Sequence, residues 1–196
     1  MKLNLSSKVC NKLVFFQTVG STNDYLADAA TEDSESWPDF SVVCAEEQTA
    51  GRGRNQREWL SPASSSLSVS ILIRNPSEAA HWYGMVLAVA LTDSLISQGV
   101  QAGLKWPNDV LIDEKKIAGV LGSAHHGFVV IGIGVNLLQI DLEHTESIEN
   151  LQLNTDYDFQ LSKLLEKFSK IRNNFESAGK QQLLAKLREV SHTLGK

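Results

Sequence analysis

The stretch SEAAHWYGMVLAVALTDSLISQ, from Ser77 to Gln98, is long and strongly apolar. Ser77 is a candidate helix N-cap, Glu78 would lie in the first turn, and Gly99 is a stop signal at the far end. A helix that is apolar around its whole circumference belongs in the interior of a protein. The sequence therefore predicts a buried helix over Ser77–Gln98 at the centre of the core.

Short strands are predicted on both sides of this helix. The segments concerned are rich in β-branched and aromatic residues, and Leu67–Ile73 also alternates apolar residues with serine, which is typical of a half-buried strand. The expected strands are Lys12–Thr18, Ser41–Glu46, Leu67–Ile73, Ala102–Lys105, Val110–Ile112, Lys116–Ser123 and Phe128–Val135.

Further helices are predicted near both ends of the chain. The polar cluster Ser21–Asp24 can cap a short helix over Tyr25–Ala30, and apolar residues at helical spacing predict helices over Asp158–Ser177 and Lys180–Leu194. Gln48–Pro62 and the acidic stretch Asp141–Asn150 show no apolar period and are expected to be loops. This order of elements is typical of an α+β domain with a mixed or antiparallel sheet.

Composition limits the classes of protein to consider. The chain has 196 residues, of which 42% are hydrophobic and 21% charged, as in ordinary globular proteins. Its net charge of −5 disfavours a general binder of nucleic acid or anionic membranes. Five histidines and two scattered cysteines are too few for a structural zinc site. We expect Cys10 and Cys44 to be reduced, in one compact cytoplasmic domain spanning residues 1–196 without a signal peptide or membrane span.

The loop GRGRNQREW, Gly51–Trp59, concentrates three arginines in an acidic protein. Arginine makes bidentate contacts with carboxylates and phosphates, and the interleaved glycines let backbone N–H groups approach an anion closely. The loop therefore either binds an anion or is a solvated basic segment that contacts nothing.

Lys105–Asp109, KWPND, places polar side chains at the end of a strand. Pro107 stops a continuing central strand, so Asn108 and Asp109 leave the sheet on a rigid turn. They could hold a ligand or a cation, or they could simply initiate the turn. Lys116 opens the next apolar strand and either extends outward or reaches a buried anion.

Two further motifs suggest ligand contacts. IGIGVN, Ile131–Asn136, alternates glycine with β-branched residues, so one face of the strand carries no side chains and admits a flat ligand or another backbone. It lacks the third glycine and the following helix of a dinucleotide fingerprint. The side chains of Ser21–Asn23 could bind a polar ligand or merely cap the helix.

Together these segments resemble the catalytic domain of the biotin protein ligases. STN at Ser21–Asn23, QTAGRGR at Gln48–Arg54, KWPND with KIAGVL at Lys105–Leu121, and GIGVN at Gly132–Asn136 occur in the order of that family. The resemblance implies a mixed, largely antiparallel sheet flanked by helices, of the class II aminoacyl-tRNA synthetase type. It also implies a ligase that uses ATP and Mg²⁺ to convert biotin to biotinyl-5′-AMP, and then transfers biotin to a lysine of a biotin carboxyl carrier protein.

The resemblance also assigns roles to residues. The catalytic residues it implies are Arg52, Arg54, Lys105, Asp109 and Lys116. The biotin-binding residues it implies are Ser21, Thr22, Asn23, Gln48, Arg52, Gly53, Arg54, Lys116, Gly132 and Gly134. The ATP-binding residues it implies are Arg52, Arg54, Lys105, Asn108 and Asn136, and no metal ligand is named. Relatives frequently dimerise through a sheet edge, so a homodimer is a further possibility.

The chain departs from the family pattern in three respects. Asn55 and Gln56 replace the Arg-Gly of the common GRGRRGR loop, so we expect a less basic and stiffer loop. No aromatic residue follows Asn136 before Tyr157, so no adenine-stacking side chain can be named. The N-terminal helix-turn-helix and the C-terminal small β-barrel of many relatives are not expected, and neither is DNA binding.

Two other functions remain open at this point. A lipoate or octanoyl ligase or transferase shares the fold and modifies a similar carrier lysine. A non-catalytic biotin-binding relative is the other alternative, although retention of Arg52, Lys105, Asp109 and Lys116 favours an enzyme.

Overall fold

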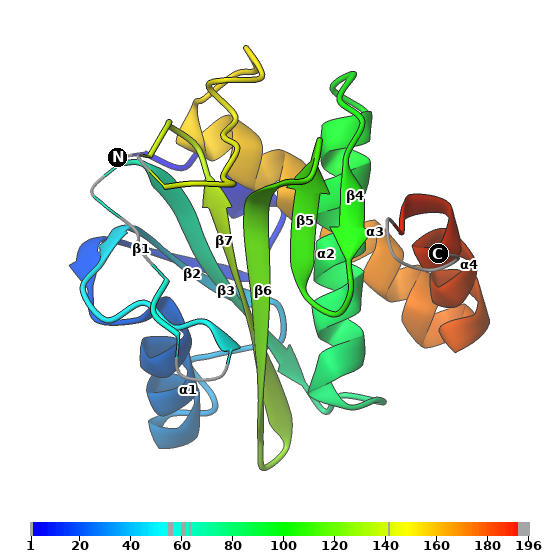
Figure 1. Ribbon diagram of the computed structural model, residues 1–196. Coiled ribbons are helices and arrows are strands. Elements are labelled where there is room, and N and C mark those ends of the chain that lie inside the picture. The colour runs from blue at the N-terminus through cyan, green and yellow to red at the C-terminus, as the bar shows by residue number, and fades with distance from the viewer. Residues whose placement is uncertain (1, 55–56, 60–61, 63, 141, 192–196) are drawn as a thin grey trace.

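A computed structural model describes residues 2–54, 57–59, 62, 64–140 and 142–191 (Figure 1). Its elements are a 3₁₀ helix at Ser6–Lys8, β1 at Lys12–Val19, α1 at Thr22–Glu32, β2 at Ser41–Gln48, β3 at Ser66–Arg74, α2 at Ala80–Ile96, β4 at Gly103–Lys105, β5 at Asp109–Ile112, β6 at Lys115–His125, β7 at Phe128–Asn136, α3 at Tyr157–Ala178 and α4 at Lys180–Val190.

The strands form one sheet of seven, in the order β1-β2-β3-β7-β6-β5-β4. β1 and β2 are parallel and every other neighbouring pair is antiparallel, so the predicted mixed, largely antiparallel sheet is confirmed. α2 packs on β6 and β7 with α3 against it, whereas α1 packs on β2 and β3 from the opposite face (Figure 1). The sheet is therefore covered by helices of different length on its two faces.

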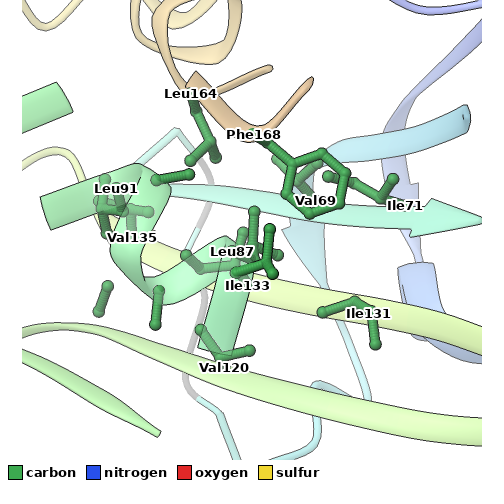
Figure 2. Packing of buried hydrophobic residues seen from close by; sticks show 14 of the residues in the cluster. Val69, Ile71, Leu87, Leu91, Val120, Ile131, Ile133, Val135, Leu164 and Phe168 are labelled. Carbon is green, nitrogen blue, oxygen red and sulfur yellow. The ribbon is translucent and has the colours of Figure 1, made fainter. Parts of the chain in front are cut away.

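α2 is buried along most of its length, as its composition predicted. Figure 2 shows Leu87 and Leu91 of this helix among side chains of β3, β6, β7 and α3. The predicted N-cap is wrong: α2 begins at Ala80, and the Ser77 backbone N–H donates instead to the Tyr83 hydroxyl at 3.1 Å. Ser77 thus lies in the loop before α2, where it binds the hydroxyl of Tyr83, a residue of the same helix.

α1 covers a smaller apolar cluster on the other face. Leu26 and Ala30 pack there against Leu72 of β3 and Val130 of β7. The helix is longer than predicted at both ends, and Ser21 is its N-cap, with its hydroxyl 3.4 Å from the backbone nitrogen of Asp24. The first turn of α1 is therefore fixed on the sheet by burial below it and by capping at its start.

The remaining boundaries agree closely with the prediction, apart from the 3₁₀ helix at Ser6–Lys8, which was missed. α4 ends at Val190 rather than at Leu194, and residues 192–196 lie outside the described part. Cys10 and Cys44 are both free thiols. Within the described part of the chain, none of the helices has the length and apolar character needed to cross a bilayer.

The 3₁₀ helix is held by a buried carboxylate of α3. The two oxygens of Asp158 accept hydrogen bonds from the backbone N–H groups of Leu5 at 2.8 Å and Ser6 at 2.9 Å. Burial of Asp158 raises the pKa of its carboxyl, but the hydrogen bonds from Leu5 and Ser6 outweigh burial and leave the pKa below 3.8. The folded state therefore favours the ionised form.

We expect Asp158→Asn to lower the free energy of unfolding by about 1–3 kcal/mol, because an amide cannot accept at both positions. Since the folded pKa is depressed, the contribution of Asp158 should be complete above pH 3.8 and disappear as the pH falls below that value. Urea unfolding of both proteins against pH measures this. Glu166→Gln, an exposed change on the same helix, should stay within about 0.5 kcal/mol. A constant difference at all pH values would contradict the assignment.

Candidate functional site

A cavity of about 250 Å³ lies on the α1 face of the sheet. The first turn of α1 and the Gly51–Trp59 loop form its walls, together with the turn that precedes β5. Its floor is formed by β3, β7 and β6, which are neighbours in the sheet. All four predicted motifs therefore contribute residues to one cavity.

The floor of the cavity carries small residues on adjacent strands. Gly134 of β7 pairs with Ser68 of β3 on one side and with Gly119 of β6 on the other. Gly119 in turn pairs with Asp109 of β5. Paired residues of neighbouring strands point to the same face of a sheet. Residues Ser68, Gly134, Gly119 and Asp109 therefore form one row across four neighbouring strands, on the cavity face of the sheet.

The glycines of β7 make room for side chains of this same chain. A Cβ atom on Gly132 would lie 2.8 Å from Asn23 Oδ1, and one on Gly134 would overlap the Trp59 indole. Each is well inside normal contact distance. The strand face that glycine alternation predicted to be bare is thus covered in part by Asn23 and Trp59. Trp59 thus brings an aromatic side chain to this cavity from the end of the Gly51–Trp59 loop.

One end of the cavity is a polar pocket at the start of α1. The backbone N–H and the hydroxyl of Thr22 both lie within hydrogen-bond distance of Gln48 Oε1, at 2.8 and 3.0 Å. The Ser70 hydroxyl lies 2.7 Å from Asn23 Oδ1 and 2.8 Å from Thr22 Oγ1. These residues therefore bind one another as well as cap the helix. Ser70 was not predicted as a site residue. The alternation of serine with apolar residues along Leu67–Ile73 was the sequence signal that could have identified it.

The other end of the cavity is charged. Lys116 Nζ lies 2.8 Å from Asp109 Oδ1 and 5.5 Å from the centre of the Trp59 ring. The ammonium and carboxylate form a charge pair without the alignment of a hydrogen bond, because Asp109 Oδ1 has no hydrogen-bond partner in the described part of the chain. Of the two predicted directions for Lys116, the inward one is correct.

A β-bulge aims Lys116 into the cavity. Val110 of β5 pairs with Ala118, but the next residue, Leu111, pairs with Lys116, so Ile117 is an extra residue on β6. Side chains alternate between the two faces along a regular strand, and an extra residue reverses the alternation. Lys116 consequently lies on the same face as Gly119, where a Cβ atom would be 3.1 Å from its Nζ.

The Gly51–Trp59 loop contacts both of the other walls, the first turn of α1 and the turn that precedes β5. Arg52 forms an ion pair with Asp24 in the first turn of α1, whereas Arg54 Nη1 donates to Asn108 Oδ1 at 3.2 Å on the opposite wall. Backbone bonds inside the loop join Gly53 N to Arg57 O at 2.7 Å and Trp59 N to Gly51 O at 3.0 Å. Asn55 and Gln56 lie outside the described residues, so the predicted effect of these two residues is not tested.

Two predicted site residues lie away from this cavity. Lys105, at the end of β4, lines a separate small pocket beside Trp106 and Pro107. Asn136 is on the cavity face of β7 but only 2% exposed, with its amide nitrogen 3.3 Å from Lys116 O and 3.0 Å from Glu146 O. The roles of Lys105 and Asn136 toward ATP stay predictions.

The family model described as "Biotin/lipoate A/B protein ligase family" matches residues 15–136, which is more than half of the chain and includes every motif of the cavity. The chain belongs to this family. The resemblance that the motifs predicted is thereby confirmed.

The curated and solved relatives of this chain include ligases whose names contain biotin. The biotin–[acetyl-CoA-carboxylase] ligase of Mycobacterium tuberculosis is 41% identical over 128 residues, covering 61% of this chain and 47% of the relative. The bifunctional ligase/repressor BirA of Escherichia coli is 33% identical over 142 residues, covering 67% and 42%. The chain thus spans about half the length of these relatives. The structure of the Aquifex aeolicus biotin protein ligase in complex with biotin and ATP superposes with a TM-score of 0.82 at 28% identity, covering 95% of this chain and 81% of that one.

A change of Gly134 to alanine tests the packing of this family member's cavity. The added methyl group would displace the Trp59 indole, so we expect a loss of about 1–3 kcal/mol in the free energy of unfolding and a red shift of Trp59 fluorescence. Urea unfolding and emission spectra measure both. In a Trp59→Phe background, Gly134→Ala should lower the free energy of unfolding by a smaller amount. Gly20→Ala, where a Cβ atom would meet open space, is the matched control. Equal cost in both backgrounds would show that Trp59 does not lie on Gly134.

Proposed function

We propose that this chain is a biotin protein ligase, which activates biotin with ATP and transfers it to a lysine of a biotin carboxyl carrier protein. The observation that carries the proposal is a single cavity with a polar pocket at one end, a floor of glycine and tryptophan, and cationic side chains at the other end. Biotin has the same sequence of chemical groups: a ureido ring, an aliphatic chain and a carboxylate. The names of the relatives support the same substrate.

The polar pocket suits the ureido ring in particular. A ureido group has N–H donors and a carbonyl acceptor, and the pocket offers hydroxyl and amide groups that can meet both kinds of atom. The aliphatic chain would then lie against the Trp59 indole and the glycine floor. The proposed biotin-binding set is Ser21, Thr22, Asn23, Gln48, Arg52, Gly53, Arg54, Lys116, Gly132 and Gly134.

The same pocket argues against lipoate. The dithiolane ring of lipoate has no N–H group and no carbonyl, so it would leave the polar groups of Thr22, Asn23 and Gln48 without ligand partners. These groups would keep their bonds to one another, but a ring without N–H or carbonyl groups would cover their remaining donor and acceptor capacity and offer no hydrogen bond in return. Biotin is therefore the better substrate on chemical grounds.

In the first step, a carboxylate oxygen of biotin attacks the α-phosphorus of ATP, and the bond to the bridging oxygen of pyrophosphate breaks. Two anions must approach each other, so positive charge is needed where they meet. Arg52, Arg54 and Lys116 would supply it, and Asp109 would hold the Lys116 ammonium in place. In the second step, the amine of a carrier lysine attacks the acyl carbon, AMP leaves and the amine loses a proton. Asp109 would orient that amine.

ATP would bind beyond Gly134, toward Asn136. The amide nitrogen of Asn136 is committed to two backbone carbonyls, and its buried Oδ1 has no hydrogen-bond partner in the described part of the chain. Such a fixed acceptor suits the amino group of adenine. Arg52, Arg54, Lys105 and Asn108 are proposed for the phosphates. Mg²⁺ would screen the charge of the phosphates, and Glu58 and Asp109 are the two carboxylates that line the cavity where it would bind.

Three further statements accompany the proposal. The acceptor would be a biotin carboxyl carrier domain of acetyl-CoA carboxylase or a related carboxylase. The protein would act in the cytoplasm, and pairing through a sheet edge would give a homodimer. A non-catalytic biotin binder is the alternative against which the charged end of the cavity argues, since binding alone does not require Lys116 paired with Asp109.

The test is to incubate the chain with biotin, MgATP and a carrier domain, and to measure pyrophosphate release and biotinylation. We expect both, with labelled lipoate inactive. Lys116→Met should lower adenylate formation by about 10²-fold or more, because it removes charge beside the reacting phosphate. Lys115→Met is the matched control, since Lys115 is 53% exposed and pairs with Glu146 outside the cavity. Biotin binding without any pyrophosphate release would support the non-catalytic alternative and overturn the enzyme proposal.

A further inference from the structure

Asp24, in the first turn of α1, contacts Arg52 of the Gly51–Trp59 loop. We propose that Asp24 is a positioning residue that anchors Arg52 to α1 and thereby holds the start of the loop, with Arg52 and Arg54, at the cavity where substrate anions would bind. The part of this proposal that concerns substrate rests on the proposed function. The part that concerns the loop rests on geometry alone.

The ion pair between Asp24 and Arg52 links the polar pocket to the Gly51–Trp59 loop. Asp24 directly follows Thr22 and Asn23, which form the pocket, and all three lie in one helical turn. The base of the loop is tied to the preceding segment by backbone bonds from Thr49 N to Val19 O at 3.0 Å and from Ala50 N to Gly20 O at 2.8 Å. Asp24 extends this attachment two residues further, to Arg52.

The two arginines of the loop have partners of different charge. Arg52 faces the carboxylate of Asp24, but Arg54 faces the neutral amide of Asn108. Both bonds have a charged guanidinium as donor, but only Arg52 and Asp24 also attract each other as opposite charges. An incoming carboxylate or phosphate would therefore take Arg54 from Asn108 more easily than it would take Arg52 from Asp24. Arg52 is thus the anchored arginine and Arg54 the exchangeable one.

An acidic residue in the first turn of a helix also stabilises the helix dipole, and this alone could explain Asp24. The two explanations differ in what they predict for the loop. A dipole role predicts a change in stability without a change at Arg52, whereas the anchor predicts greater access to the Arg52–Gly53 peptide bond. The glutamate of Asp24→Glu keeps the negative charge at the helix start and can still reach Arg52. This variant should therefore keep most of the protection of the Arg52–Gly53 peptide bond.

The experiment compares Asp24→Asn with Asp28→Asn, which removes the same charge from an exposed position one turn along α1. The first readout is the rate of trypsin cleavage after Arg52 in the ligand-free protein. Exposed ion pairs contribute little, so we expect a rise of roughly three- to fivefold in Asp24→Asn and none in Asp28→Asn. Added salt should raise cleavage of the wild type but not of Asp24→Asn. Thermal unfolding verifies that both variants are folded.

The second readout is the steady-state kinetics of adenylate formation. Asp24→Asn should raise the KM for biotin roughly three- to fivefold with little change in kcat, and should have no further effect in an Arg52→Ala background. Cleavage and KM equal to those of Asp28→Asn would overturn the proposal, and so would an additive effect in the double variant. If the wild type itself does not use biotin, the proposed function fails, and the trypsin measurement still decides whether Asp24 anchors the loop.

Discussion

The site depends on one steric constraint, the absence of side chains on the cavity face of β7. Gly132 lets Asn23 reach the sheet and Gly134 lets the Trp59 indole lie on it. A methyl group at either position would push away the first turn of α1 or the end of the arginine loop. The polar pocket and the charged end are the two ends of the cavity. The distance between them depends on Asn23 lying on Gly132 and Trp59 lying on Gly134.

Strand register brings together residues that are far apart in the chain. The row Ser68–Gly134–Gly119–Asp109 crosses four strands, so the carboxylate at the start of β5 lies level with the glycines of β6 and β7. The large core formed by α2 and α3 on the other face keeps this part of the sheet rigid. A floor supported by this core, under a loop with contacts on two sides of the cavity, suits the proposed reaction, in which two anions must be brought together.

Much of the fold followed from local pattern. The apolar period identified α2, the closing helices and all seven strands, because burial of apolar side chains decides secondary structure where the pattern is strong. The errors were at element ends and in the 3₁₀ helix at Ser6–Lys8, which was not predicted. Ser77 looked like the N-cap of α2, but Tyr83 of the same helix takes its N–H group, and no local pattern reports such a contact. The motif residues were likewise found from sequence, although their mutual contacts were not.

The sequence by itself determined the type of sheet, the family and the chemical groups of the site, since these depend on residue identity and order. Tertiary structure decided where those groups point. Lys116 enters the cavity only because a bulge at Ile117 reverses the alternation of β6, and Arg52 and Arg54 take different partners because the loop spans two walls. Direction depends on register and on neighbours distant in the chain, and local residue patterns contain neither.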